Sequence, residues 1–301
     1  MILAVPNVAE GRDFERIGRL VEVLEYGPVE LLDWSSDLDH NRAVFSLSGG
    51  GPDLVNSVTQ LAGILAGGAG IEEWQGVHPT IGMLDVAPFV WIGPEGREEA
   101  EAAAADAGRR LGEAGIPVFL YGALATSPDR RERSWFRRGG EVALRSRMES
   151  GELRPDFGPT APHPVMGATL VTARPPLVAF NVELEGGDPG AADRIASIIR
   201  ESGGGPKGLR AIGLELSTGR SQVSMNVEEP GEGSLGEIVR RIRPLAEAEV
   251  ANVIEAELIG MTPEVALDDF PEEVPIRNFD PDRQVIERRL GHSGGGGGET
   301  A

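Results

Sequence analysis

The sequence contains no cysteine, and this absence alone excludes several kinds of site. Disulfides, cysteine-liganded zinc, iron–sulfur clusters and cysteine nucleophiles all require that side chain. Long hydrophobic runs are also absent, because no apolar stretch approaches the ~18–20 residues that cross a bilayer. The N-terminus has no basic region, and its apolar run ends at Pro6. We therefore expect no signal peptide, no membrane partner and a cytoplasmic location.

Positively charged residues are also few relative to negatively charged ones. The 301 residues carry 28 Lys and Arg against 48 Asp and Glu, which gives a formal net charge of −20. Nucleic acids and anionic membranes are recognised by clustered positive charge, so neither is expected as a partner. Small anionic substrates are not excluded, because they respond to the local field of a cleft rather than to the net charge.

Three motifs of phosphate, hydrolase and zinc sites are missing as well. Gly49–Gly51 is a glycine run, but it lacks the G-K-[ST] ending of a P-loop. Neither a G-x-S-x-G elbow nor an H-E-x-x-H motif occurs in the sequence. We therefore predict no phosphate loop and no metal site.

Glycine and proline, by contrast, are abundant, with 42 and 22 residues. Part of this excess lies at the C-terminus, where residues 293–301 read SGGGGGETA. A segment with so little apolar surface cannot bury a core, so we predict a disordered tail over 291–301. Elsewhere glycine and proline fall between periodic segments, where they mark turns.

The periodic segments form a duplicated pattern. Each half reads strand–helix–strand–strand–helix–strand, and VAFNVELEGGD (178–188) echoes ILAVPNVAEGRD (2–13). Such a repeat is typical of two split-βαβ, ferredoxin-like units. We therefore expect an α+β fold made of a duplicated ferredoxin-like pair, residues 1–176 and 177–290. Clefts between such domains are favoured ligand sites.

The first half carries the longer insertions. A charged helical stretch is predicted over 129–149, and a Pro- and Gly-rich loop over 151–167. The helical stretch holds the one strongly basic patch of the chain, with Arg130, Arg131, Arg133, Arg137 and Arg138. Two interpretations stay open, an anion-binding site and a solvated helix face.

His78 is the first candidate catalytic residue, in the segment GVHPTIGMLDVAPF (76–89). Pro79 disfavours helical geometry at His78 and stiffens its backbone. An imidazole with a pKa near ~6.5 is suited to passing a proton at neutral pH. Asp85 would orient or charge it. The alternative is a histidine that serves only the turn before a strand.

His40 lies in DLDHNR (37–42), between Asp37, Asp39 and Arg42. Carboxylate and imidazole groups are metal ligands, so a metal site is one interpretation. A solvated hairpin turn is the favoured interpretation, because Asp and Asn are ordinary turn residues, so no metal is predicted at His40. Arg42 enters the following strand, where it would hold a carboxylate through a bidentate pair.

His163 lies in the loop RPDFGPTAPHPVMGAT (154–169), which is rich in proline. Loops this long inside compact domains are usually functional or disordered. Phe157 and the Gly158–Pro159 turn would form an apolar platform for a flat ring. A linker between domains is the alternative.

Taken together, these motifs resemble the formiminotransferase family, glutamate formimidoyltransferase. The resemblance is carried in order along residues 1–290 by VPNVAEGRD (5–13), DHNRAVFSLSG (39–49), GVHPTIGMLDVAPF (76–89), PVFLYG (117–122), RRGGEVAL (137–144), RPDFGP (154–159), HPVMGATLVTAR (163–174), LVAFNVEL (177–184) and FDPDRQVIERRL (279–290).

The resemblance implies a fold and a reaction. The fold is a duplicated ferredoxin-like pair with a folate-binding tunnel between the halves. The reaction moves the formimidoyl group of N-formimidoyl-L-glutamate to tetrahydrofolate, the co-substrate, and releases glutamate. This is a step of histidine degradation that feeds one-carbon metabolism. The resemblance further implies a homodimer.

The resemblance also implies site residues. The family's catalytic histidine falls on His78. Its folate-contacting loop falls on Pro155–Pro164, and Asp39 and Arg42 would contact substrate. The loop residues are Pro155, Asp156, Phe157, Gly158, Pro159, His163 and Pro164.

One departure from the family pattern bears on the substrate. The family commonly has arginine two residues after this histidine, and here Thr80 stands in its place. Two alternatives therefore stay open, a different formyl or formimidoyl donor, and a folate-binding protein without transferase activity. With two anionic substrates, the region around His78 and residues 137–164 is expected to be locally positive despite the net charge.

Overall fold

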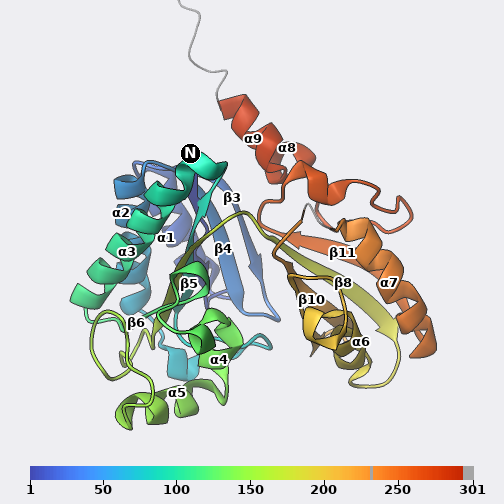
Figure 1. Cartoon of the computed structure of the whole chain (residues 1–301), viewed down its shortest axis with the longest axis horizontal. Helices are drawn as coiled ribbons and strands as arrows, with labels where there is room; N and C mark the ends of the chain where they lie inside the picture. Colours follow the sequence, from blue (N-terminus) through green and yellow to red (C-terminus); the bar gives the residue numbers. More distant parts are fainter. Residues whose placement is uncertain (231–232, 294–301) are drawn as a thin grey trace, which may run out of the picture. The chain divides into compact units, whose positions relative to one another are not determined.

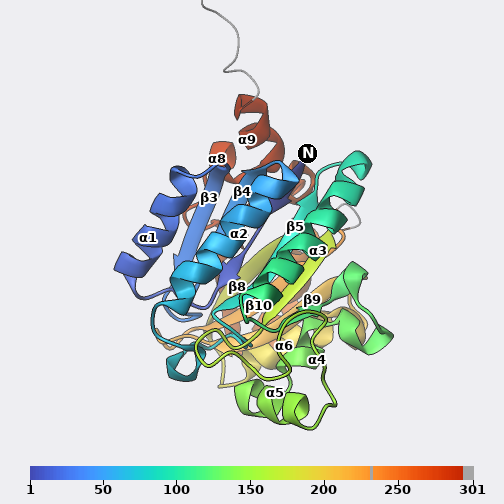
Figure 2. The same cartoon turned by 90° about the vertical axis from the view of Figure 1, so that its left-hand side faces the viewer.

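The computed structural model describes residues 1–230 and 233–293 and divides the chain into two compact units, Met1–Pro175 and Pro176–Ala301. Each unit contains the strand–helix–strand–strand–helix–strand order of a ferredoxin-like fold (Figures 1 and 2). The predicted α+β class and its duplication are therefore confirmed. Part of the expected tail, residues 294–301, lies outside the described residues. No helix of the described residues is long and apolar enough to cross a membrane.

The first unit is built on one mixed sheet. Its elements are β1 (Ile2–Ala4), β2 (Asn7–Val8), α1 (Phe14–Glu25), β3 (Glu30–Asp37), β4 (Arg42–Gly49), α2 (Gly51–Ala66), β5 (Leu84–Trp91), α3 (Arg97–Glu113), β6 (Val118–Leu120), α4 (Arg133–Arg137), α5 (Gly140–Glu149) and β7 (Thr169–Arg174).

β1 and β2 act as two halves of one strand between β4 and β5. Both halves pair antiparallel with β4 and with β5, while β3 pairs with the other edge of β4. Pro6 separates the halves because it has no N–H to donate to the ladder. Its carbonyl still accepts from Phe45 N at 3.1 Å, so the strand continues across the break.

β7 and β6 extend this antiparallel core. β7 pairs parallel with β5, and β6 pairs parallel with β7. β7 was not among the expected strands, because TLVTAR lies next to the proline-rich segment that resembled a linker. It is almost wholly buried, with only Arg174 half-buried, as is typical of a strand inside a parallel sheet.

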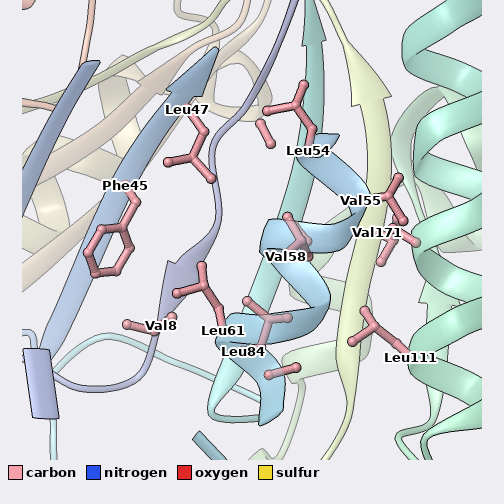
Figure 3. Packing of buried hydrophobic residues seen from close by; sticks show 14 of the residues in the cluster. Val8, Phe45, Leu47, Leu54, Val55, Val58, Leu61, Leu84, Leu111 and Val171 are labelled. Carbon is pink, nitrogen blue, oxygen red and sulfur yellow. The ribbon is translucent and has the colours of Figure 1, made fainter. Parts of the chain in front are cut away.

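Helices α1, α2 and α3 cover one face of this sheet (Figure 2). The apolar residues of α2 recur at helical spacing and meet side chains from β2, β4, β5, β7 and α3 (Figure 3). A second apolar cluster packs α4 and α5 against β5, β6 and β7 and contains Phe119, Phe136, Leu144 and Leu170. This second cluster places α4 close to the start of β5.

The helical stretch expected over 129–149 is broken, which corrects that prediction. α4 ends at Arg137 and α5 begins at Gly140. Gly139 and Gly140 both have left-handed backbone angles, with φ of 79° and 69°, which an α-helix cannot contain. The break lets Phe136 enter the second cluster and lets Arg137 reach the start of β5.

The second unit is a four-stranded antiparallel sheet in the order β11-β8-β10-β9. Its helices α6 and α7 supply Ile195, Ile199, Ile238 and Ile242 to the core over one face. Its elements are β8 (Val178–Gly186), α6 (Ala191–Ile199), β9 (Leu209–Glu215), β10 (Ser221–Val227), α7 (Leu235–Ala248), β11 (Ala251–Ile259), α8 (Pro281–Gln284) and α9 (Ile286–Ser293).

Candidate active site

Three loops of the first unit meet at the end of the sheet where β4 and β5 begin. They are the β3–β4 turn (38–41), the segment before β5 (74–83) and the long loop before β7 (154–168). Val77 N donates to Asp39 O at 3.1 Å and joins the first two loops. Met83 N donates to Met166 O at 3.0 Å and joins the second loop to the third. The sequence segments that carry His40, His78 and His163 are thus fastened together by backbone contacts.

Asn41 fastens the β3–β4 turn. It has a left-handed backbone with φ of 47°, which Asn tolerates better than most residues. Its Oδ1 accepts from Gly11 N at 2.9 Å and its Nδ2 donates to Gln75 O at 3.1 Å. Trp74 Nε1 donates to the Asn41 carbonyl at 2.9 Å. Asn41 therefore connects the segment that follows β2 to the loop that carries His78.

Gly82 and Gly167 form a close backbone crossing between the second and third loops. A Cβ on Gly82 would lie 2.0 Å from Ala168 O, and one on Gly167 would lie 2.4 Å from Ile81 O. Gly167 also has a left-handed φ of 66°. Only glycine fits at both positions, so the crossing fixes the backbone a few residues after His78.

The His78 imidazole is half-buried and has a defined tautomer. Its Nδ1 lies 3.0 Å from the carbonyl oxygen of Pro79. A carbonyl only accepts, so Nδ1 carries the proton and Nε2 carries the lone pair of the neutral ring. The His40 ring is stacked near it, with centroids 5.9 Å apart and planes inclined by 28°. Nε2 is therefore the nitrogen available to take a proton.

The surroundings keep His78 neutral. Burial lowers its pKa first, and the positive charges of Arg42 and Arg137 lower it further, to well below its ordinary value. The hydrogen bond with the Pro79 carbonyl opposes this shift without cancelling it. At pH 7 the ring is therefore neutral, with a free lone pair on Nε2, rather than an imidazolium.

Asp85 joins two arginines behind His78. Its side chain is fully buried, whereas those of Arg42 and Arg137 are each 10% exposed. Arg42 Nη2 donates to Asp85 Oδ2 at 2.5 Å, and Arg137 Nη2 donates to the same oxygen. Arg42 Nη2 also donates to Pro79 O at 2.7 Å. Asp85 is therefore linked to His78 through Arg42 and the Pro79 carbonyl rather than directly.

The charge state of this group follows from its contacts. Burial opposes ionisation of Asp85, but the two arginines outweigh it and hold its pKa below the ordinary value. Burial lowers the pKa of Arg42 to about 10 in spite of Asp85, so Arg42 remains charged at pH 7. Arg42 was expected to hold a substrate carboxylate, and here one of its nitrogens is already committed to Asp85.

In the third loop, the contacts of Asp156 and Phe157 fix the backbone. Asp156 Oδ2 accepts from Leu120 N and from Arg130 Nη2, each at 2.7 Å. The Phe157 ring edge lies 3.0–3.1 Å from where a Cβ on Gly108 of α3 would stand. Hydrogen bonds therefore hold the Asp156 side chain, and packing against α3 holds the Phe157 ring.

His163 closes a tight turn in the same loop. Its backbone exchanges two 2.8 Å hydrogen bonds with Gly167, and its Nδ1 accepts from Val165 N and Met166 N. Its proton is therefore on Nε2, the opposite tautomer to His78. The rest of the predicted loop is solvent-facing to different degrees: Pro155 is half-buried, and Gly158, Pro159 and Pro164 are exposed.

The basic patch separates into arginines with different surroundings. Arg130 pairs with Asp156 and lies over the Phe119 and Phe136 rings, 5.6 Å from each centroid. Arg131 and Arg138 are exposed. Arg137 pairs with Asp85 and Arg133 is half-buried. Arg42 and Arg137 thus place positive charge close to His78, whereas the local field over residues 137–164 stays a prediction.

Thr80 is buried, and its hydroxyl donates to Gly82 O at 2.9 Å. It supports the loop between His78 and the glycine crossing, so the missing arginine is replaced by a residue with a local backbone role. Asp39 is half-buried beside His40 in the first loop. Over residues 1–230 and 233–293, no three His, Asp or Glu side chains are grouped as a metal site would require.

The sequence did not fully predict the structural roles of Asp85, Asn41 and the glycine crossing. Asp85 was expected to touch His78 and instead acts on the arginines. Asn41 and the Gly82–Gly167 pair carried only the general signal of turn residues. Their partners lie far along the chain, so their roles needed the tertiary structure.

Comparison with known proteins adds independent findings. Residues 1–174 match the family model for the formiminotransferase domain, N-terminal subdomain. The chain is 36% identical over 294 residues to the glutamate formimidoyltransferase of Streptococcus pyogenes serotype M1, covering 96% of this chain and 98% of that protein. It is 30% identical over 298 residues to the glutamate formimidoyltransferase of Thermoplasma acidophilum, covering 96% and 97%. It is 34% identical to the formimidoyltransferase-cyclodeaminase of Gallus gallus, of which it covers 52%.

Proposed function

The chain belongs to the formiminotransferase domain family, and we propose that it is a glutamate formimidoyltransferase. It transfers the formimidoyl group of N-formimidoyl-L-glutamate to tetrahydrofolate and gives 5-formimidoyl-tetrahydrofolate and glutamate. The observation that carries this proposal is the neutral His78, with its Nε2 lone pair available, beside a buried arginine cluster. The proposal extends to histidine degradation, a cytoplasmic location and a homodimer, which are supported by the family resemblance alone.

The reaction needs one proton to move between two nitrogens. N5 of tetrahydrofolate attacks the formimidoyl carbon and forms a C–N bond, and His78 Nε2 takes the proton that N5 loses. The C–N bond to the glutamate nitrogen then breaks, and His78 returns the proton to that nitrogen. A histidine that is neutral at the start can act as base and then as acid.

The substrate contacts follow from charge and shape. Both substrates carry carboxylates, and the arginines near His78 supply the positive charge that a chain of net charge −20 otherwise lacks. The loop from Pro155 to Pro164, anchored through Asp156 and Phe157, would contact the folate, and its exposed members Gly158, Pro159 and Pro164 can approach a ligand. His163, Asp39 and Arg42 complete the proposed binding residues.

Turnover by the purified protein tests this function. The donor panel contains formimidoyl-glutamate, formyl-glutamate and 5-formyl-tetrahydrofolate. Tetrahydrofolate is the acceptor for the first two donors, and glutamate is the acceptor for the third. We expect formimidoyl-glutamate to react fastest. Faster reaction of a formylated donor would show that the protein's donor is a formyl compound and not formimidoyl-glutamate. Folate binding by calorimetry without turnover of any donor would reduce it to a binding protein.

A further inference from the structure

Positive charge near His78 exceeds the negative charge that balances it. Arg133 and Arg137 lie four residues apart on α4, so their side chains leave the same face of the helix. Arg42 and Arg137 share one carboxylate, that of Asp85. Burial has the largest effect on the Arg42 pKa and lowers it, whereas Asp85 raises it. The positive charges of Arg137 and, to a smaller extent, Arg133 lower it further. Three arginines are therefore close enough to repel one another around a single aspartate.

Arg133 is the member of this group without a counter-charge. It is half-buried, and no carboxylate of residues 1–230 or 233–293 forms an ion pair with it. The other basic residues of the patch are either paired, as Arg130 is with Asp156, or exposed, as Arg131 is. Part of the Arg133 side chain is out of water, and no ion pair within the described residues offsets the loss of solvation.

The hydrogen bonding of the paired arginines is also incomplete. Asp85 receives Arg42 and Arg137 on the same oxygen, Oδ2. The Nε atoms of both guanidiniums are buried and have no partner among the described residues. One aspartate therefore balances only one of the three positive charges, and a second carboxylate would balance another.

We propose that Arg133 binds the side-chain carboxylate of the formimidoyl donor. This inference rests on the proposed function. The charges of Arg42 and Arg137 act on His78, and Arg133 precedes Arg137 by four residues, ~6 Å of helix rise. In formimidoyl-glutamate the side-chain carboxylate is separated by two methylene groups from the carbon that bears the reacting nitrogen. With its nitrogen at His78, the donor would direct this carboxylate toward the arginine group, in which Arg133 alone has no ion-pair partner among the described residues.

The assignment also accounts for Thr80. The family's arginine at this place is absent, and the Thr80 hydroxyl is used by Gly82 O. Arg133 supplies a guanidinium from α4 instead of from the His78 loop.

Steady-state kinetics of Arg133→Gln test the proposal. Loss of a charge-assisted contact predicts a rise of about 10- to 100-fold in KM for formimidoyl-glutamate. We expect kcat within about threefold of wild type, because the contact is the same in the ground and transition states. KM for tetrahydrofolate should not change. Arg131→Gln is the matched control, since it removes the same charge from an exposed neighbour, and it should leave both KM values unchanged.

Two further arms make the test decisive. Formimidoyl-glutamine, which has a neutral amide in place of the side-chain carboxylate, should react poorly with wild type and lose little more with Arg133→Gln. Arg133→Lys keeps the charge without the guanidinium fork and should raise the donor KM less than Arg133→Gln does. If the glutamine variant fails to fold, the lysine variant provides the test instead.

The outcomes separate the inference from the function. An active wild type whose donor KM is unaffected by both Arg133 substitutions overturns the inference alone. A rise in KM for tetrahydrofolate instead of the donor overturns it too, because the carboxylate would then belong to folate. A wild type that does not use formimidoyl-glutamate overturns the proposed function and the inference together.

Discussion

Substitution of Gly82 by alanine should displace the loop that carries His78. A Cβ at this position would lie 2.0 Å from Ala168 O and 2.4 Å from Met166 O. Both neighbours are backbone atoms, which cannot rotate away as a flexible side chain can. The alanine variant must therefore separate two crossing segments of backbone.

The cost can be worked from the bonds that hold the crossing. Met83 N donates to Met166 O and Ala168 N donates to Ile81 O, each at 3.0 Å. Each bond contributes roughly 0.5–1.5 kcal/mol, and a buried group left without a partner costs about 1–3 kcal/mol. We therefore expect Gly82→Ala to lower the free energy of unfolding by about 2–4 kcal/mol. Turnover should fall as well, because His78 loses its fixed position.

Denaturant unfolding followed by tryptophan fluorescence measures this change. All four tryptophans lie in the first unit, so the signal reports on the unit that contains Gly82. Gly63→Ala is the matched control, because a Cβ at Gly63 in α2 meets nothing within 4 Å. Alanine there should stabilise the helix by about 0.5–1 kcal/mol. A Gly82→Ala variant with wild-type stability and turnover would refute the account of the crossing.

Four further predictions concern the charge cluster and the core. Because the pKa of His78 is lowered and its base form is the active one, wild-type kcat/KM should hold through pH 6.5 and fall only in more acidic buffer. Arg137→Gln removes a positive charge, so it should raise that pKa and move the acid limb of the pH profile to higher pH, while an unmoved limb would contradict the electrostatic cause. Asp85→Asn leaves two buried arginines without a counter-charge and should cost about 3–5 kcal/mol in urea unfolding; a loss below 1 kcal/mol would show that the pairing contributes little. Phe45→Ala removes a fully buried ring from the first core and should cost about 3–5 kcal/mol in the same assay, and retention of wild-type stability would show that this core is not tightly packed.

Much of the fold could be predicted from the sequence because the relevant signals are local. The helix at Phe14–Glu25 begins after Asp13, whose side chain accepts from Arg16 N as an N-cap should. The turn at Ser217–Gly219 is also local: Gly219 N donates to Leu216 O at 3.0 Å between β9 and β10. The strand Thr169–Arg174 escaped prediction, because its role depends on parallel pairing with β5, about eighty residues earlier in the chain.

The site was predictable in its residue types but not in its pairings. The stiff backbone before Pro79 indicated His78 as a candidate. The sequence could not show that Asp85 reaches Arg137, because the left-handed pair Gly139–Gly140 redirects α4. Nor could it separate the paired Arg130 from the unpaired Arg133. Those distinctions depend on which side chains share a buried volume.

The rate of His78→Ala relative to wild type tests the central claim most directly. The measurement is turnover of formimidoyl-glutamate with tetrahydrofolate at saturating substrate, with folding of both proteins checked by tryptophan fluorescence. Loss of a positioned general acid–base predicts a fall in kcat of about 10²–10⁴-fold. A folded His78→Ala protein that turns over at the wild-type rate would contradict the assignment of proton transfer to His78.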